Sequence, residues 1–269
     1  MMLADFKVAG VQMVSGEDLE QNLKRAEYWV TQAAEQGAQL IALPEYFTLL
    51  HHDERAKFEI AETYGDGPIQ QRLASLARKL NIWLVAGSLP LKGRQSDHVT
   101  NTTLVFDSEG LCIARYDKIH LFSFQKGEEC YNESASIEAG TQPICFDTPW
   151  GRVGLGICYD LRFPELFRGL DNVDLLIVPS AFTVPTGRAH WEVLLKARAI
   201  ENQCFLLAPA QGGHHESGRK TWGHTMTLDP WGEKLAELET GEGIIVAELK
   251  VSRFVEVRQQ LSSWLHRRL

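Results

Sequence analysis

The topology and the chemistry of this chain are both indicated by one segment, Val153-Gly-Leu-Gly-Ile-Cys158-Tyr-Asp-Leu-Arg-Phe-Pro164-Glu-Leu166. Its apolar first half predicts a strand that ends at Cys158, and Pro164 can open a helix soon afterwards. This layout places a thiol on a sharp turn near a helix N-terminus, where partial positive charge favours the thiolate. The glycines let a carbonyl group approach the backbone closely. We therefore expect Cys158 to be a nucleophile.

Two further segments end in charged side chains. Ile41-Ala-Leu-Pro44-Glu45-Tyr-Phe47 is typical of a buried strand that stops at a carboxylate, and Arg115-Tyr-Asp-Lys118-Ile-His-Leu121 carries a lysine in an amphipathic strand. In α/β folds, chemistry gathers at strand ends. Hydrolysis of an amide by a thiol also needs a proton carrier and a positive environment for the oxyanion. Glu45 and Lys118 are the predicted partners, and the backbone N–H of Tyr159 is expected to complete the oxyanion hole.

Each of these side chains also has an ordinary structural interpretation. A cysteine after an apolar strand is more often a small core residue. A glutamate can simply begin a loop, and a lysine can extend from a strand edge with its stem on apolar surface. The joint presence of Glu45, Lys118 and Cys158 carries the prediction.

The composition limits the class of protein. The 269 residues contain no linker, low-complexity tract or charge block, so we expect one domain over residues 1–269. The net charge of −8 makes nucleic acid an unexpected partner. No apolar run is long enough to cross a bilayer and no signal segment is evident, so we expect a cytoplasmic protein without a membrane partner. Five cysteines without CxxC spacing favour a reducing compartment over a disulfide framework.

The order of predicted elements indicates an α/β fold. We expect mixed sheets, packed face to face with helices outside them. Strands are predicted at 6–14, 40–43, 82–87, 174–179, 204–210 and 243–249, helices at 18–36, 69–80 and 191–202, and hairpins within 102–115, 144–153 and 226–236.

Three blocks in this order resemble the signatures of the nitrilase (carbon-nitrogen hydrolase) superfamily: Leu43-Pro-Glu45, Tyr116-Asp-Lys118-Ile-His-Leu, and Gly156-Ile-Cys158-Tyr-Asp-Leu-Arg-Phe-Pro-Glu. The similarity extends over essentially the whole chain. It implies a four-layer αββα sandwich, a Glu45–Lys118–Cys158 triad, and a homodimer or larger homo-oligomer. The family also carries a second glutamate, which Tyr131-Asn-Glu133-Ser matches. Glu133 is then expected to orient Lys118 or the substrate.

Other segments narrow the resemblance within the superfamily. The stretches 179–183, 189–204, 223–226 and 229–232 are more similar to amidases that cleave deaminated glutathione to 2-oxoglutarate and cysteinylglycine than to enzymes acting on nitriles. Because this substrate carries a 2-oxo acid carboxylate, Arg162 is the expected anchor, although it could instead pair with Glu165. Thr183 is expected to bind the acyl part, and Arg188 the dipeptide end.

Several alternatives remain open from the sequence. Omega-amidase activity on 2-oxoglutaramate and N-carbamoyl hydrolase activity are rivals within the family, and a non-catalytic assembly subunit is a rival outside enzymes. His214-His215-Glu216 is a possible metal motif, but adjacent histidines point apart and lack a third ligand at suitable spacing. A cysteine–histidine pair with His190 or His224 is conceivable. We expect no metal and no cofactor.

Overall fold

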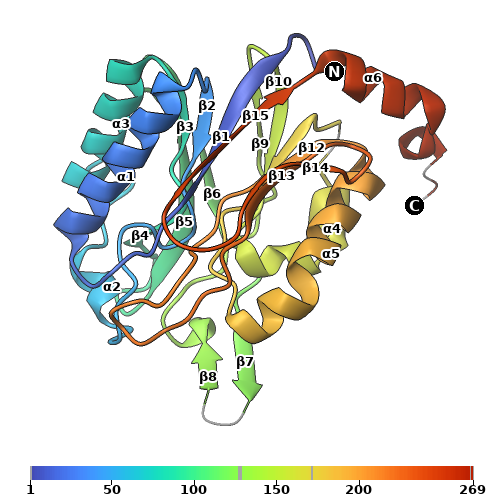
Figure 1. Ribbon diagram of the computed structural model, residues 1–269. Helices are drawn as coiled ribbons and strands as arrows, with labels where there is room; N and C mark the ends of the chain where they lie inside the picture. The colour runs from blue at the N-terminus through green and yellow to red at the C-terminus, as the bar shows by residue number, and fades with distance from the viewer. Residues whose placement is uncertain (1, 127–128, 171, 267, 269) are drawn as a thin grey trace.

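Two mixed sheets face each other in the computed structural model, which describes residues 2–126, 129–170, 172–266 and 268 (Figure 1). The first sheet has the order β15-β1-β2-β3-β5-β4, with β6 paired to β5. Its strands are β1 (Phe6–Gln12), β2 (Leu40–Ala42), β3 (Trp83–Val85), β4 (Leu89–Lys92), β5 (Val99–Phe106), β6 (Cys112–Asp117) and β15 (Gly243–Leu249).

The second sheet has the order β14-β13-β12-β11-β10-β9, and a short hairpin of β7 and β8 stands apart from both sheets (Figure 1). The second sheet and the hairpin comprise β7 (Ser123–Lys126), β8 (Glu129–Asn132), β9 (Cys145–Thr148), β10 (Gly151–Leu155), β11 (Leu175–Ile177), β12 (Phe205–Ala208), β13 (Thr225–Leu228) and β14 (Lys234–Leu238). The centre of each main sheet is parallel, β1-β2-β3 in one and β10-β11-β12 in the other.

Helices cover the outer faces of the two sheets. Figure 1 shows α1 and α3 against the first sheet and α4 and α5 against the second, which gives the expected αββα layers. The helices are α1 (Leu19–Glu35), α2 (Ala56–Glu59), α3 (Pro68–Leu80), α4 (Pro164–Arg168), α5 (Val184–Asn202) and α6 (Val251–Gln260), with 3-10 turns at η1 (Glu133–Ala135), η2 (Cys158–Arg162) and η3 (Ser263–His266).

Local sequence explains where these helices begin and end. The Asp18 carboxylate accepts a hydrogen bond from the Gln21 N–H at 3.0 Å and caps α1, and Gly37 follows its end with φ +85°. Pro68 opens α3, where the buried Glu62 carboxylate accepts hydrogen bonds from the N–H groups of Ile69 and Gln70.

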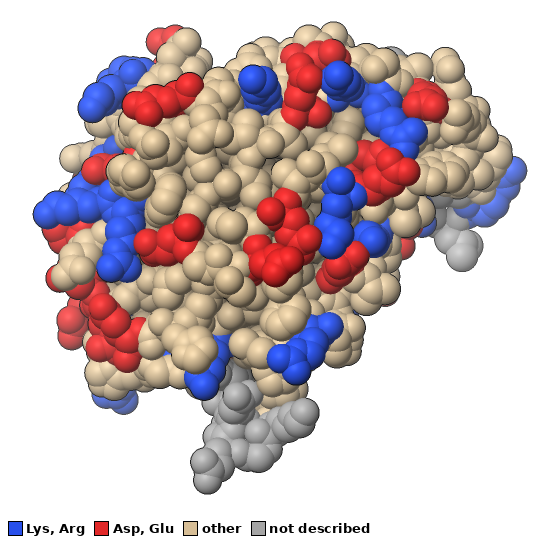
Figure 2. All heavy atoms as spheres, viewed as in Figure 1, with Lys and Arg blue, Asp and Glu red and all other residues tan. Residues whose placement is uncertain are grey.

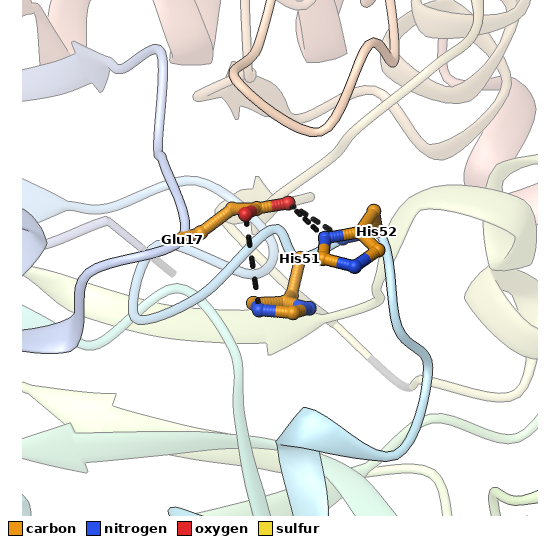
Figure 3. A group of neighbouring side chains, drawn as sticks. All are labelled: Glu17, His51 and His52. Atoms are coloured by element: carbon orange, nitrogen blue, oxygen red, sulfur yellow. Dashed lines mark hydrogen bonds and ion pairs between the residues drawn. The ribbon is translucent and has the colours of Figure 1, made fainter.

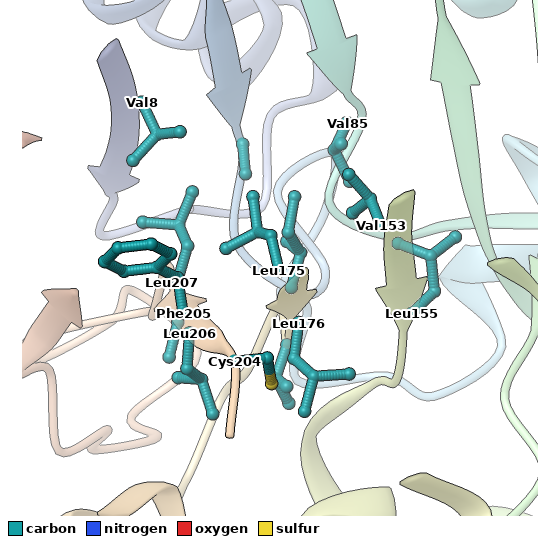
Figure 4. Packing of buried hydrophobic residues seen from close by; sticks show 14 of the residues in the cluster. Val8, Val85, Val153, Leu155, Leu175, Leu176, Cys204, Phe205, Leu206 and Leu207 are labelled. Atoms are coloured by element: carbon teal, nitrogen blue, oxygen red, sulfur yellow. The ribbon is translucent and has the colours of Figure 1, made fainter. Parts of the chain in front are cut away.

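Side chains that alternate between the two faces of each strand produce two apolar layers. Val8 and Val85 of the first sheet pack against the second sheet, where Leu155 and Leu175 belong to the same cluster (Figure 4). Leu40 is a member of this cluster too. Their neighbours Ala9, Ile41 and Leu84 instead pack against α1 and α3. Successive strand side chains point to opposite faces, so each central strand needs apolar residues throughout.

The two ends of the chain meet in one sheet. β1 pairs with β15 in antiparallel register from Phe6 opposite Leu249 to Gln12 opposite Gly243. The first sheet is therefore built from segments at both ends of the sequence.

The structure differs from the sequence-based prediction in a few elements. The helix expected from Trp191 begins seven residues earlier, at Val184, because Pro185 is well suited to a first helical turn. The strand expected around Lys118 ends at Asp117. Strands β4, β7 and β8 have no counterpart in the prediction, because they are short and lack a long apolar pattern.

The surface is mixed in charge on the face drawn in Figure 2, where acidic and basic side chains are interspersed. In the part of the chain that the structure describes, no helix is both long enough and apolar enough to cross a bilayer.

One close backbone approach sets the path of the chain into Glu45. Gly87 follows β3 with φ +44°, and a Cβ at this position would lie 2.1 Å from the carbonyl oxygen of Pro44. The turn after β3 therefore packs directly on the segment that precedes Glu45. Only glycine satisfies both the positive φ and the contact.

We predict that Gly87→Ala lowers the free energy of unfolding by about 3 kcal/mol, because it adds a clash with backbone to the cost of a positive φ. Gly65→Ala is the matched control, since Gly65 has φ +80° but no atom within 4 Å of the point that a Cβ would occupy. It should cost only about 1 kcal/mol. Urea unfolding of both variants measures the difference, and equal losses would contradict the role of the contact.

Candidate active site

Strand ends of both sheets meet around one small cavity. Glu45 follows β2, Lys118 follows β6, Cys158 begins the 3-10 turn after β10, and Thr183 lies between β11 and α5. The cavity is lined by Glu45, Lys118, Phe122, Glu133, Cys158, Tyr159, Arg162, Ala181, Phe182, Thr183, Thr186 and Arg219. Of the eight site residues predicted from the sequence, seven line it.

A buried ion cluster forms one wall of the cavity. The Lys118 ammonium, only 1% exposed, donates to Glu45 Oε1 at 2.8 Å and to both oxygens of Glu133 at 2.8 and 3.0 Å. Glu133 also accepts from the Tyr46 hydroxyl at 2.5 Å and from the Phe122 N–H at 2.7 Å. These contacts fix all three charged groups in one geometry.

The pKa values in the cluster follow from its charges. Burial alone lowers the pKa of Lys118, but the carboxylates of Glu133 and Glu45 more than offset it, so the pKa is raised. Burial pushes the pKa of Glu133 upward, and the charge and hydrogen bond of Lys118 reverse this, so the pKa is lowered. Lys118 and Glu133 are therefore an ion pair at neutral pH.

The Cys158 thiol lies beside this cluster, and its state differs from the expected thiolate. Burial first, and then the charge of Glu45, raise the pKa of Cys158 well above its usual value, although Lys118 and the Ala181 N–H act in the opposite direction. The opening of a five-residue 3-10 turn does not overcome burial. The resting sulfur thus carries its proton, and a neighbouring base has to remove it.

The backbone is strained at Cys158 and at the residue that follows Glu45. Cys158 has φ +47°, and Tyr46, which follows Glu45, has φ +54°. A left-handed conformation costs a non-glycine residue about 1–2 kcal/mol. Because Tyr159 is in the first turn of η2, its N–H has no acceptor within that turn, and the residue lines the same cavity as Cys158.

Arg162 offers a positive charge to the cavity. Its guanidinium lies 5.6 Å from the centre of the Tyr159 ring and 5.4 Å from that of Phe182, and it donates to His190 Nδ1 at 3.2 Å. In the described chain no carboxylate pairs with it, and the expected alternative partner Glu165 makes no such contact. The aromatic rings hold the cation while leaving its charge without an anion.

Thr183 and Arg188, both predicted to bind substrate, have different positions. The Thr183 hydroxyl lines the cavity and contacts that of Thr186 at 2.8 Å. Arg188 instead stacks over Trp222 and lines a separate surface cavity. It lies two residues beyond Thr186, about 200° around the helix, so it faces away from Cys158.

Some residues of the site carried no signal in the sequence. Asn101 donates to Glu45 Oε1 at 3.0 Å from the buried strand β5, and Gln211 donates to the Glu45 carbonyl at 3.1 Å. Arg219 lines the cavity from the loop before β13. The side chains of Cys130 and Tyr131, in the block around Glu133, fall outside the described part.

A second cavity adjoins the first. Phe122, Glu133 and Arg219 line both of them. The inner cavity, with the sulfur, has a volume of about 10 Å³, and the outer one, which reaches His51 and Lys57, has about 110 Å³. The inner cavity has room for about one water molecule, so a bound acyl group requires lining side chains outside the ion cluster to move.

One group of side chains in the described part of the chain brings three metal-ligand atoms close together. Glu17, His51 and His52 lie together (Figure 3), and His51 also lines the outer cavity. His52 Nδ1 lies 2.7 Å from Glu17 Oε1, so it donates to the carboxylate. His51 Nδ1 accepts from the Asp53 N–H at 2.9 Å, which leaves the proton of a neutral ring on the nitrogen facing Glu17.

The other histidines considered from the sequence are engaged elsewhere. His215 is bound between the Ser15 carbonyl and the Thr221 hydroxyl, and burial lowers its pKa to about 4. His224 contacts Glu237 at 2.8 Å, and neither it nor His190 lines the cavity of Cys158.

The fold and these side chains define an αββα sandwich with a cysteine, a lysine and a carboxylate in one buried cavity. The chain belongs to the carbon-nitrogen hydrolase family, whose model matches residues 7–259. The expected superfamily and fold are thereby confirmed.

Individual relatives agree with this assignment. The chain is 41% identical over 266 residues to deaminated glutathione amidase of Yersinia enterocolitica, covering 97% of this chain and 92% of that protein. It is 35% identical to human omega-amidase NIT2, covering 99% and 96%. The crystal structure of the Caenorhabditis elegans NitFhit protein superposes with a TM-score of 0.92 at 40% identity, covering all of this chain and 66% of that one.

We predict that Glu45→Gln changes the reactivity of the thiol and the turnover of amide in opposite directions. Removing the carboxylate charge lowers the pKa of Cys158, so alkylation by iodoacetamide between pH 7 and 9 becomes faster. Loss of the base should slow amide hydrolysis by about 10²- to 10⁴-fold. Glu237→Gln, remote from the thiol, should change neither rate. Slower alkylation with normal turnover would show that Glu45 does not act on the sulfur.

Proposed function

We propose that this protein is an amidase that hydrolyses deaminated glutathione to 2-oxoglutarate and cysteinylglycine through a cysteine thioester, in metabolite repair. One observation carries the proposal: Cys158, Glu45 and Lys118 share a buried cavity with Arg162, a cation that no carboxylate of the described residues pairs with. The named relative from Yersinia supports the substrate.

The first half of the reaction forms the thioester. Glu45 takes the proton of the Cys158 thiol as the sulfur attacks the amide carbonyl carbon. Lys118 and the Tyr159 N–H stabilise the oxyanion. One ammonium hydrogen is available for it, because one of three serves Glu45 and one can be shared by the two oxygens of Glu133. The C–N bond then breaks, and Glu45 returns its proton to the departing amine.

The second half releases the acid. Water attacks the thioester carbonyl while Glu45 accepts a proton, and the same donors hold the second oxyanion. The C–S bond breaks, the carboxylic acid leaves, and Glu45 returns a proton to the sulfur. Glu133 orients Lys118 throughout by holding its ammonium, and no cofactor or metal takes part in any step.

Charge around the cavity supports a carboxylated acyl group. Arg162 supplies a guanidinium, Thr183 a hydroxyl, and the 19-residue helix α5 begins beside them with the positive end of its dipole. The adjoining outer cavity supports a leaving group larger than ammonia. Omega-amidase activity on 2-oxoglutaramate is the second candidate, which the 35% identity to human omega-amidase favours.

Further properties of the chain belong to the same proposal. It acts as one domain over 1–269, supported by the pairing of β1 with β15. It forms a homodimer or larger homo-oligomer, supported by Val193 and Ile200, which are 61% and 46% exposed on α5, while Trp191 of the same helix packs inside. It is cytoplasmic, supported by free thiols at the described cysteines.

We predict the highest kcat/KM for deaminated glutathione, in a comparison with 2-oxoglutaramate and an N-carbamoyl amino acid. Acid-quenched enzyme should carry an acyl adduct on Cys158 by mass spectrometry. Cys158→Ala should lose the adduct and the activity, whereas Cys112→Ala, at an exposed cysteine, should keep both. Persistent turnover in Cys158→Ala would refute the nucleophile, and a preference for 2-oxoglutaramate would favour omega-amidase.

We predict that Arg162→Gln raises KM for a carboxylated amide by about 30- to 150-fold, because a charge-assisted hydrogen bond is worth about 2–3 kcal/mol. The same variant should turn over a substrate whose carboxylate has been converted to an amide at nearly the rate of the unmodified enzyme. Arg188→Gln provides the matched control, since that arginine faces another cavity. An effect from Arg188→Gln and none from Arg162→Gln would reverse the assignment.

A further inference from the structure

Asp160 is a buried carboxylate that the proposed chemistry does not use. Its residue is 0% exposed, it lies two positions after Cys158 in the 3-10 turn, and it does not line the cavity. A charge placed so deeply needs full hydrogen bonding to be tolerated. Its four bonds therefore indicate what it does.

Each oxygen of Asp160 accepts two hydrogen bonds. Oδ2 accepts from the Ile157 N–H at 2.8 Å and from the Tyr116 hydroxyl at 2.7 Å. Oδ1 accepts from the His120 N–H at 2.9 Å and from His120 Nδ1 at 2.7 Å. The His120 proton must be on Nδ1, because an ionised carboxylate can only accept.

These donors come from two segments that belong to different sheets. Ile157 directly precedes Cys158 after β10, whereas Tyr116 and His120 stand two residues before and two residues after Lys118, at the end of β6. Asp160 thus holds both ends of the five-residue stretch centred on Lys118 and joins it to the turn that carries the sulfur.

Aromatic stacking adds a second link between the same segments. The His120 ring lies parallel to Phe163, with centres 3.7 Å apart and planes 5° apart, and Phe163 contacts Tyr159 edge to face. His120 is therefore clamped between Asp160 and the residue that ends the turn.

We infer that Asp160 is a positioning residue, which sets the distance between Cys158 Sγ and Lys118 Nζ by tying the nucleophile turn to the lysine segment. The inference rests on the proposed roles of Cys158 and Lys118. It also gives the strained φ of Cys158 a support, because the Ile157–Asp160 hydrogen bond closes the turn at that residue.

The test is Asp160→Asn, which keeps the shape of the side chain but turns one acceptor into a donor and so opposes two of the four hydrogen bonds. We expect kcat for the preferred amide to fall about 100-fold, since a displacement of about 1 Å costs that much, with KM changed less than about threefold. The pH midpoint for alkylation of Cys158 should move upward, because the sulfur loses part of the influence of Lys118.

Asp229→Asn is the matched control. Asp229 is 1% exposed, accepts from Trp231, Glu233 and Arg253, and lies in a turn remote from the cavity. If Asp160 had only a structural role, Asp160→Asn would lower the melting temperature, as Asp229→Asn should. It would change neither kcat per titrated active site nor the pH midpoint for alkylation of Cys158. That result would overturn the inference.

Tyr116→Phe keeps the inference testable if Asp160→Asn does not fold. It removes one bond to Asp160 Oδ2, and we expect a fall in kcat of about 3- to 10-fold, which corresponds to one hydrogen bond. Unchanged kcat in folded Tyr116→Phe would overturn the inference. Cys158→Ala separates the two proposals, because its activity tests the nucleophile alone: an inactive Cys158→Ala beside a fully active Asp160→Asn rejects only the positioning role.

Discussion

The ammonium of Lys118, buried between two carboxylates, is the constraint on which the site depends. Removing an ion from water costs several kcal/mol, and only well-placed opposite charges offset this. Glu45 and Glu133 provide them at 2.8 Å each. Deleting one partner of such a cluster costs about 3–5 kcal/mol, so the three residues behave as one structural unit.

The net charge of Lys118, Glu45 and Glu133 together also explains why the Cys158 sulfur is protonated. One cation and two anions leave an excess negative charge beside Cys158, and burial already disfavours a thiolate. The thiol is therefore neutral at rest and depends on the adjacent carboxylate for activation. Lys118 and Asn101 both donate hydrogen bonds to the Glu45 carboxylate. Gln211, from the opposite half of the sandwich, donates to the backbone carbonyl of Glu45.

Much of this arrangement could be predicted from the sequence, and particular residues show why the rest could not. Glu45 and Cys158 follow apolar strands, and a strand end has a definite place in a sheet, so their meeting was predictable. Arg188 was expected in a loop before the helix, but α5 begins at Val184 and so contains it, and the arginine lines a separate cavity. The thiolate was expected from a helix terminus, but burial and a neighbouring charge depend on tertiary packing. Arg219 and Gln211 enter from loops without periodicity.

The antiparallel contact of β1 with β15 has a consequence for synthesis of the protein. During translation, β1 emerges from the ribosome long before β15, which follows about 240 residues later. At 5–20 residues per second this interval is roughly 10–50 s, during which one edge of β1 has no strand beside it. Unpaired edges are prone to wrong pairing, so the nascent chain depends on shielding of this edge of β1 until β15 has been made.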